Sequence, residues 1–225
     1  MPLTHPRPGR EDRRSRYGLL LSALVVAFAI EGVATPAPWE QALVSALLGA
    51  TLVLAFWVAD ARPAMMRLAG FVSVCVFAAS VIEAANGTIG GAATLLANLL
   101  LVVLAPPFVV LGVMRTMRAR AGVTIESVFG VLCLYILIGM GFALIYGAIA
   151  RLSGSFFAHN VDATTARCLY FSFTTLTTVG YGDLTASSNL GHTLSVTEAL
   201  VGQIYLVTIV SVMVGNLRRR TVPQD

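Results

Sequence analysis

The sequence predicts an all-α membrane protein with six transmembrane helices and one shorter segment that enters and leaves the membrane on the same side. Two observations predict this class. Of the 225 residues, 57% are hydrophobic and only 12% are charged, whereas a soluble domain carries about 25% charged residues. The apolar residues are also gathered into stretches long enough to cross a bilayer as helices. The chain lacks the charge to cover a surface that faces water, so we expect a lipid bilayer to be its solvent.

Six apolar stretches are long enough to span the membrane, and we expect their ends to be right to within a few residues. They are residues 18–34, 41–59, 67–85, 92–114, 124–150 and 190–217. The half-apolar segment 162–183 is too short and too broken to span. Its backbone needs protein or water around it, because lipid tails cannot form hydrogen bonds with peptide groups. A signal peptide is the alternative interpretation of the first stretch, although Glu31 interrupts it.

The basic residues, all of them arginines, indicate the orientation. With six spans, all of them except Arg151 and Arg167 lie on one side of the membrane. Because basic residues favour the cytoplasmic side, we expect both termini in the cytoplasm of a multi-pass protein of the cell membrane. Residues 151–189 then lie on the outer side. The basic residues form no aromatic-interleaved patch, so we expect no nucleic-acid partner.

Residues 162–183 carry the pattern from which a function can be argued. Asp162 or Thr164 can cap the start of a helix, and the residues after them are largely apolar to about Thr177. That helix must stop because Gly180 and Gly182 follow at alternate positions. In an ordinary strand successive carbonyls point to opposite sides. Left-handed dihedrals at alternate residues, which glycine adopts without steric cost, would turn them all to one side.

A ring of such segments would line a narrow tube with carbonyl oxygens, which can replace the water shell of a dehydrated potassium ion. The Thr178 hydroxyl would lie at the inner end. One chain supplies one wall and holds no second copy of the segment, so four chains are needed to close the ring around a central pore. The negative ends of the preceding helix dipoles would favour a cation below the tube.

These residues resemble the potassium channel family. The run Thr177-Thr178-Val179-Gly180-Tyr181-Gly182-Asp183 is identical to the signature of that family, and the stretch from Leu169 to Asp183 looks like the pore helix and filter of bacterial channels with a two-helix pore. The stretch from Glu198 to Gln203 is similar to the family's inner helix. The close resemblance covers roughly residues 124–217.

The resemblance implies a role for each filter residue. The carbonyls of Thr178, Val179, Gly180 and Tyr181 would coordinate K⁺, with the Thr178 hydroxyl, and Gly182 would complete the outer mouth. Asp183 would brace the filter from behind.

Many relatives pair that aspartate with a tryptophan of the pore helix. This chain has Tyr170 at the matching position, so the brace is altered but the phenol can still reach Asp183.

The last span carries three further expectations. Gly202 matches the hinge of the family's inner helix. Glu198 lies one helical turn before it, and we expect it behind the filter, bonded to pore-helix hydroxyls such as Thr174 or Thr175, although it could instead reach outer water. Helical spacing below the hinge predicts a mostly apolar cavity lining. The lining residues are Gln203, Leu206, Val207, Val210, Ser211 and Val214.

The first four spans lack the mark of a voltage sensor, an arginine at every third position of the fourth span. Arg115 and Arg118 lie at the cytoplasmic end of that span, where we interpret them as anchors rather than as a residual sensor. Pro106-Pro107 should kink or break the span. We expect Glu31 and Glu83 to face the outer interface; a cation-attracting or proton-sensing role is the alternative.

The domain prediction has four parts: residues 1–17 and 218–225 as cytoplasmic tails, 18–120 as a bundle without a sensor, and 121–217 as the pore domain. We expect a homotetrameric, potassium-selective channel that is not strongly voltage-gated. We expect no enzymatic activity and no cofactor besides the permeant K⁺, because no nucleophile, acid–base pair or metal cluster converges. A potassium-uptake transporter subunit and a non-conducting modulatory subunit are the alternatives, and current from the purified protein alone would separate them from the channel.

Overall fold

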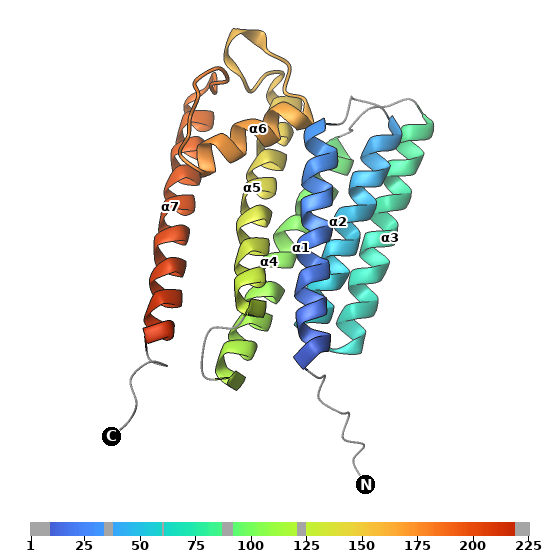
Figure 1. The fold of residues 1–225 in the computed structure, drawn as a ribbon. Coiled ribbons are helices and arrows are strands. Elements are labelled where there is room, and N and C mark those ends of the chain that lie inside the picture. Colours follow the sequence, from blue (N-terminus) through green and yellow to red (C-terminus); the bar gives the residue numbers. More distant parts are fainter. Residues whose placement is uncertain (1–9, 34–37, 60, 87–91, 121–124, 219–225) are drawn as a thin grey trace, which may run out of the picture.

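The computed structural model describes residues 10–33, 38–59, 61–86, 92–120 and 125–218, and within these the chain is helical with short connections (Figure 1). The long helices are α1 (Arg10–Val33), α2 (Pro38–Val58), α3 (Pro63–Ala85), α4 (Ala92–Arg120), α5 (Ile125–Ser153) and α7 (Asn189–Arg218). Each corresponds to one predicted stretch. Most ends differ by no more than four residues, but α1 begins eight residues earlier and α4 ends six residues later than predicted. The shorter α6 (Thr165–Leu176) falls inside the segment predicted to be too short to span.

Four of the described helices hold an apolar stretch long enough to cross a membrane, in α1, α3, α4 and α5. The apolar part of α2, Ala42–Val58, is shorter, and the described part of α7 does not reach the same combination of length and apolarity. The chain is therefore an all-helical, multi-pass membrane protein. The full count of six crossings remains a prediction.

Two groups of helices lie side by side (Figure 1). The helices α1 to α4 form a bundle, in which α2 packs on α1, α3 and α4. On the other side, α6 lies across the ends of the long helices between α5 and α7 (Figure 1). Of the bundle, α1 packs on both α5 and α6, whereas α4 packs on α5. The two groups therefore meet along α1, α4 and α5.

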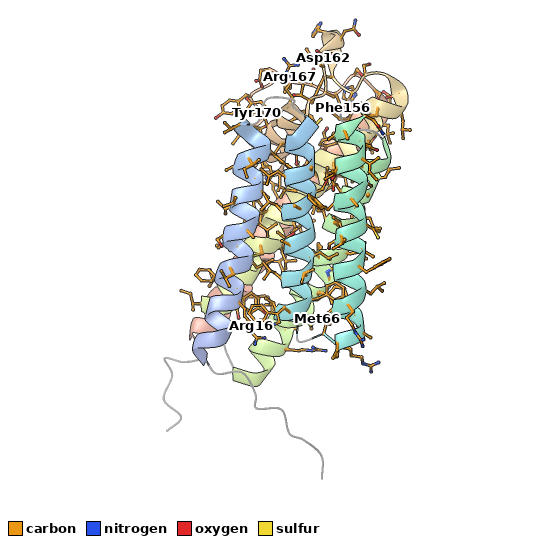
Figure 2. The ribbon with its side chains drawn as sticks, turned by 90° about the vertical axis from the view of Figure 1, so that its right-hand side faces the viewer. Arg16, Met66, Phe156, Asp162, Arg167 and Tyr170 are labelled. Carbon is orange, nitrogen blue, oxygen red and sulfur yellow. The ribbon has the colours of Figure 1, made fainter. Side chains whose placement is uncertain are left out.

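Apolar side chains dominate the bundle, inside and outside. Leu20, Leu24 and Leu48 are fully buried in its core. On α3, Phe71 and Val74 are exposed in the single chain, which suits a surface that faces lipid tails. Figure 2 shows this face, with α1, α2 and α3 toward the viewer.

Two arginines hold the end of the bundle that lies opposite to α6. The Arg16 guanidinium lies over the Trp57 ring, 4.1 Å from its centroid, and the Arg115 guanidinium donates to the Ala59 carbonyl. Arg16 lies at the opposite end of the molecule from Arg167 (Figure 2). This separation agrees with the prediction that Arg167 lies on the other side of the membrane from most of the arginines.

The expectation that Pro106-Pro107 kinks or breaks the fourth span is wrong for the break, while the kink stays a prediction. The helix α4 continues through both prolines. Next to them Phe108 stacks on Phe56 of α2, with ring centroids 3.6 Å apart. Packing on α2 and α5 holds this part of α4 in helical geometry although proline removes backbone donors.

The expectation that Glu31 faces the outer interface is also wrong. Its side chain is only 4% exposed and lines a cavity of about 20 Å³ with residues of α5 and α6, among them Arg151 and Cys168. Glu83 accepts a hydrogen bond from the Thr94 hydroxyl at 2.5 Å, so it joins α3 to α4. Sequence spacing located both carboxylates near helix ends but could not show that Glu31 turns toward α6.

Candidate ion-conduction site

The helix α6 begins with a side-chain cap. The Thr164 hydroxyl accepts a hydrogen bond from the Arg167 backbone N–H at 3.3 Å, so Thr164, rather than Asp162, is the N-cap. The Asp162 carbonyl instead accepts from the Arg167 guanidinium at 3.0 Å. One face of α6 is buried against its neighbours and includes Leu169 and Leu176. This capped and half-buried helix fixes the position of the segment that follows it.

The backbone turns sharply after α6 and is tied to its last turn. The Thr178 N–H donates to the Thr175 carbonyl at 2.9 Å, and the N–H groups of Val179 and Gly180 both donate to the Thr174 carbonyl, at 2.9 and 3.1 Å. Thr174 therefore supports the predicted filter through its backbone. Its hydroxyl donates to the Phe171 carbonyl and plays no part in these contacts.

The dihedrals of this segment alternate. Thr178, Gly180 and Gly182 have φ of 59°, 52° and 80°, whereas Val179 and Tyr181 are not among the residues with positive φ. Glycine reaches the left-handed region without strain, but Thr178 does so at a cost of roughly 1–2 kcal/mol. Strained backbone is characteristic of functional sites whose surroundings hold it in place. Alternation of this kind turns successive carbonyls toward one side.

Tyr170 contacts Asp183, the pair that the resemblance predicts as a brace. The phenol hydroxyl donates to the Asp183 carboxylate, and the Tyr170 and Tyr181 rings are nearly parallel, with centroids 6.3 Å apart. Desolvation, the hydrogen bond to Asp183 and the charge of that carboxylate all raise the pKa of Tyr170. The phenol therefore remains the proton donor of this pair.

Two backbone hydrogen bonds hold the residues that follow the predicted filter. The Ala158 N–H donates to the Thr185 carbonyl at 2.8 Å, and the Ser187 N–H donates to the Phe156 carbonyl at 2.9 Å. The Phe156 and Phe157 rings lie 5.8 and 5.4 Å from the ring of Phe171 in α6. The loop before α6 therefore packs on α6 and forms hydrogen bonds with the residues that follow the predicted filter.

Glu198 of α7 is fully buried behind α6, but not with the predicted partners. Its carboxyl oxygens lie 2.5 Å from the Ser172 hydroxyl and 2.6 Å from the Tyr146 hydroxyl of α5. The prediction of a pore-helix hydroxyl was therefore right in kind, but the residue is Ser172 rather than Thr174 or Thr175. Ser172 lies on the buried face of α6, which faces α5 and α7.

Gly202 allows α7 to approach the end of α6. A methyl group on Gly202 would lie 2.3 Å from the Leu176 carbonyl oxygen, which leaves no room for a side chain. Gly139 of α5 is in a similar position, because a methyl group there would lie 2.7 Å from the Phe173 ring. The described part of α7 is helical on both sides of Gly202, so close packing is a structural reason for this glycine. The hinge role remains a prediction.

The predicted cavity lining lies on an exposed part of α7. Gln203, Leu206, Val207 and Ser211 are exposed in the single chain, while the side chains of Val210 and Val214 lie outside the described residues. Ile204, on a different side of α7, is also exposed, at 64%. The single chain thus leaves two flanks of α7 uncovered, and its geometry alone does not assign one of them to a cavity.

Sequence reasoning missed Tyr146 and the Phe156–Phe157 pair. A signal for Tyr146 was present, because a buried glutamate requires donors and few polar side chains occur in α5. No comparable signal pointed to the phenylalanines. Their role depends on a loop that folds back on α6.

The comparisons with known proteins agree with this geometry. A family model described as an ion channel matches residues 138–219, which hold most of α5, all of α6 and the predicted filter, and α7. No curated protein and no solved structure matches the chain. The match supports the resemblance to potassium channels. Residues 138–219 are therefore similar to an ion channel domain.

Proposed function

We propose that this chain is a subunit of a homotetrameric channel that conducts dehydrated K⁺ passively and selectively. The observation that carries the proposal is the alternation of positive φ at Thr178, Gly180 and Gly182. Carbonyls turned to one side can take the place of water around an ion of fitting size. The carbonyls of Thr178 to Tyr181 and the Thr178 hydroxyl are the proposed K⁺ ligands.

The exposure of the filter supports assembly. Val179 is 52% exposed and Tyr181 is 72% exposed in the single chain, although the segment is held firmly at both ends. Large exposed apolar and aromatic groups beside backbone carbonyls favour a partner surface. Four copies around an axis would cover these side chains and close the ring of carbonyls.

The remaining parts of the proposal concern orientation and control. We infer six membrane crossings in the cell membrane, with both termini cytoplasmic and α6 near the outer side. The bundle of residues 18–120 anchors the pore domain of residues 121–217 rather than sensing voltage. Arg115 supports this view, because its guanidinium is engaged with the Ala59 carbonyl at the end of the bundle.

Flux through the purified, reconstituted protein tests the proposal. We expect K⁺ to permeate far better than Na⁺, Ba²⁺ to block because its radius is similar, and Tyr181→Asp to weaken the discrimination between K⁺ and Na⁺. Equal K⁺ and Na⁺ currents in the unmodified protein would contradict selectivity. Absence of any current from the protein alone would favour a modulatory subunit, and a need for a second polypeptide or an energy source would favour a transporter subunit.

A further inference from the structure

Three side chains and one backbone carbonyl, from α5, α6 and α7, lie next to one another on the buried side of α6. Their oxygen atoms are within hydrogen-bonding distance of one another in sequence. The Tyr146 hydroxyl lies 2.6 Å from Glu198 Oε2, and the Ser172 hydroxyl lies 2.5 Å from Glu198 Oε1. The same Ser172 hydroxyl lies 2.7 Å from the Gly139 carbonyl oxygen. These are three separate hydrogen-bond contacts, and Ser172 takes part in two of them.

Proton counting decides the state of the carboxyl group. A tyrosine hydroxyl and a serine hydroxyl each carry one proton, whereas a backbone carbonyl and an ionised carboxylate carry none. Three contacts then share two protons, and one contact would bring two lone pairs together at hydrogen-bonding distance. A proton on Glu198 Oε1 resolves this. Glu198 donates to Ser172, Ser172 donates to the Gly139 carbonyl, and Tyr146 donates to Glu198 Oε2.

We propose that Glu198 is a neutral carboxylic acid in the folded channel and acts as a positioning residue that ties α6 to α5 and α7. Its proton completes an unbroken chain of donors and acceptors from Tyr146 to the Gly139 carbonyl. The hydrogen-bond chain holds the middle of α6 from behind, on the same helix whose last turn carries Thr174 and the filter.

The surroundings of Glu198 agree with the neutral form. The side chain is 0% exposed, so water cannot stabilise an ionised group there. The ionisable groups that face it are the phenols of Tyr146 and Tyr135 on α5, with the Cys168 thiol of α6 next to Tyr146. None of these groups carries positive charge at neutral pH, and an unpaired buried carboxylate is strongly unfavourable.

Infrared spectroscopy of the full chain in lipid vesicles measures this proton directly. A protonated carboxylic acid has a carbonyl stretching band that an ionised carboxylate lacks. We expect this band at neutral pH in the unmodified protein, its loss in Glu198→Gln, and its persistence in Glu31→Gln, a matched variant at the other carboxyl group that is buried among the described residues. If the spectra of the unmodified protein and Glu198→Gln show no such difference, Glu198 is ionised and the inference is wrong.

The pH profile of stability separates this role from simple packing. Raising the pH removes the Glu198 proton, so we expect the unfolding temperature of the unmodified protein to fall in alkaline solution. Glu198→Gln should show less of this fall, because an amide can donate to Ser172 and accept from Tyr146 at any pH. Glu198→Ala should be less stable than Glu198→Gln at neutral pH. Identical alkaline profiles for the unmodified protein and Glu198→Gln would overturn the inference.

The link from this proton to filter positioning rests on the proposed channel function, but neither measurement requires conduction. If the protein shows the Glu198 band but conducts Na⁺ and K⁺ equally, the inference about the Glu198 proton holds and the proposed selectivity is refuted. If the protein conducts K⁺ selectively but lacks the band, the selectivity holds and the inference about the Glu198 proton is refuted.

Discussion

The bundle and the region around α6 differ in the interactions that hold their interiors together. Leucines such as Leu20, Leu48 and Leu101 fill the interior of the bundle. Among α5, α6 and α7, side-chain hydrogen bonds join one helix to another. The Tyr135 hydroxyl donates to the Leu176 carbonyl at 3.3 Å, and the Tyr205 hydroxyl donates to the Val131 carbonyl at 2.6 Å.

Apolar packing and hydrogen bonding differ in what they specify. Apolar contacts are non-directional, and cores accept hydrophobic replacements of similar volume at modest cost. Hydrogen bonds weaken steeply when distance or angle changes. The bundle depends mainly on the former, with few hydrogen bonds between its described helices such as that from Thr94 to Glu83. The carbonyls proposed to replace the water around an ion need fixed positions. We therefore expect substitutions around α6 to have larger effects than equivalent substitutions in the bundle.

The largest expected effect is at Gly180. Alanine at its φ of 52° costs roughly 1–2 kcal/mol and turns a proposed ion ligand away from the axis. We expect the K⁺/Na⁺ permeability ratio to fall by about tenfold or more, which corresponds to a loss of about 1.4 kcal/mol in the discrimination between the two ions. Gly70→Ala on α3, where a methyl group meets nothing within 4 Å, is the control and should leave the ratio unchanged. Similar K⁺/Na⁺ permeability ratios in the two variants would show that the region around α6 is no more sensitive to substitution than the bundle.

The next effect concerns Gly202. A methyl group 2.3 Å from the Leu176 carbonyl oxygen must displace α6 or α7, and overpacking of this kind costs roughly 1–3 kcal/mol. We expect Gly202→Ala to lower the unfolding temperature and the yield of assembled protein. Gly141→Ala adds a methyl group in ordinary contact, 3.7 Å from Val102, and should be nearly neutral. A stable Gly202→Ala protein with normal flux would show that the α6–α7 contact adapts as readily as the bundle.

A smaller effect distinguishes the two uncovered flanks of α7. We expect a cysteine at Leu206 to react with thiol reagents from the inner side only when the pore is open. A cysteine at Ile204 should be protected in the assembled protein. Both variants need Cys75→Ser, because Cys75 is an exposed native thiol. Reaction at position 204 and protection at position 206 would mean that α7 is rotated relative to the prediction.

The smallest expected effect is on voltage dependence. Moving one elementary charge across the membrane is worth about 2.3 kcal/mol per 100 mV, but Arg115 is already bonded at the end of the bundle. We expect neutralising Arg115 and Arg118 together to leave the open probability weakly dependent on voltage, as in the unmodified protein. A steep voltage dependence that collapses in the double variant would show that the bundle moves in the field.

The order of the helices and the segment with left-handed glycines could be predicted from the sequence. Span length follows from bilayer thickness, and the alternation of Gly180 and Gly182 follows from local dihedral preference, so neither requires knowledge of distant contacts. The left-handed Thr178 was not predicted, because a threonine reaches φ of 59° only when surrounding structure holds it there.

Only the tertiary structure decided which polar groups meet. The partners of Glu198 come from α5 and α6, at Tyr146 and Ser172. Rotating α6 by one residue would replace the Ser172 hydroxyl with a phenylalanine ring. The burial of Glu31 depends in the same way on how α1 packs against α5 and α6. The sequence by itself determined periods and lengths, which are properties of one segment. Helix rotation and approach arise from packing between segments, where single glycines such as Gly202 decide how closely two helices can lie.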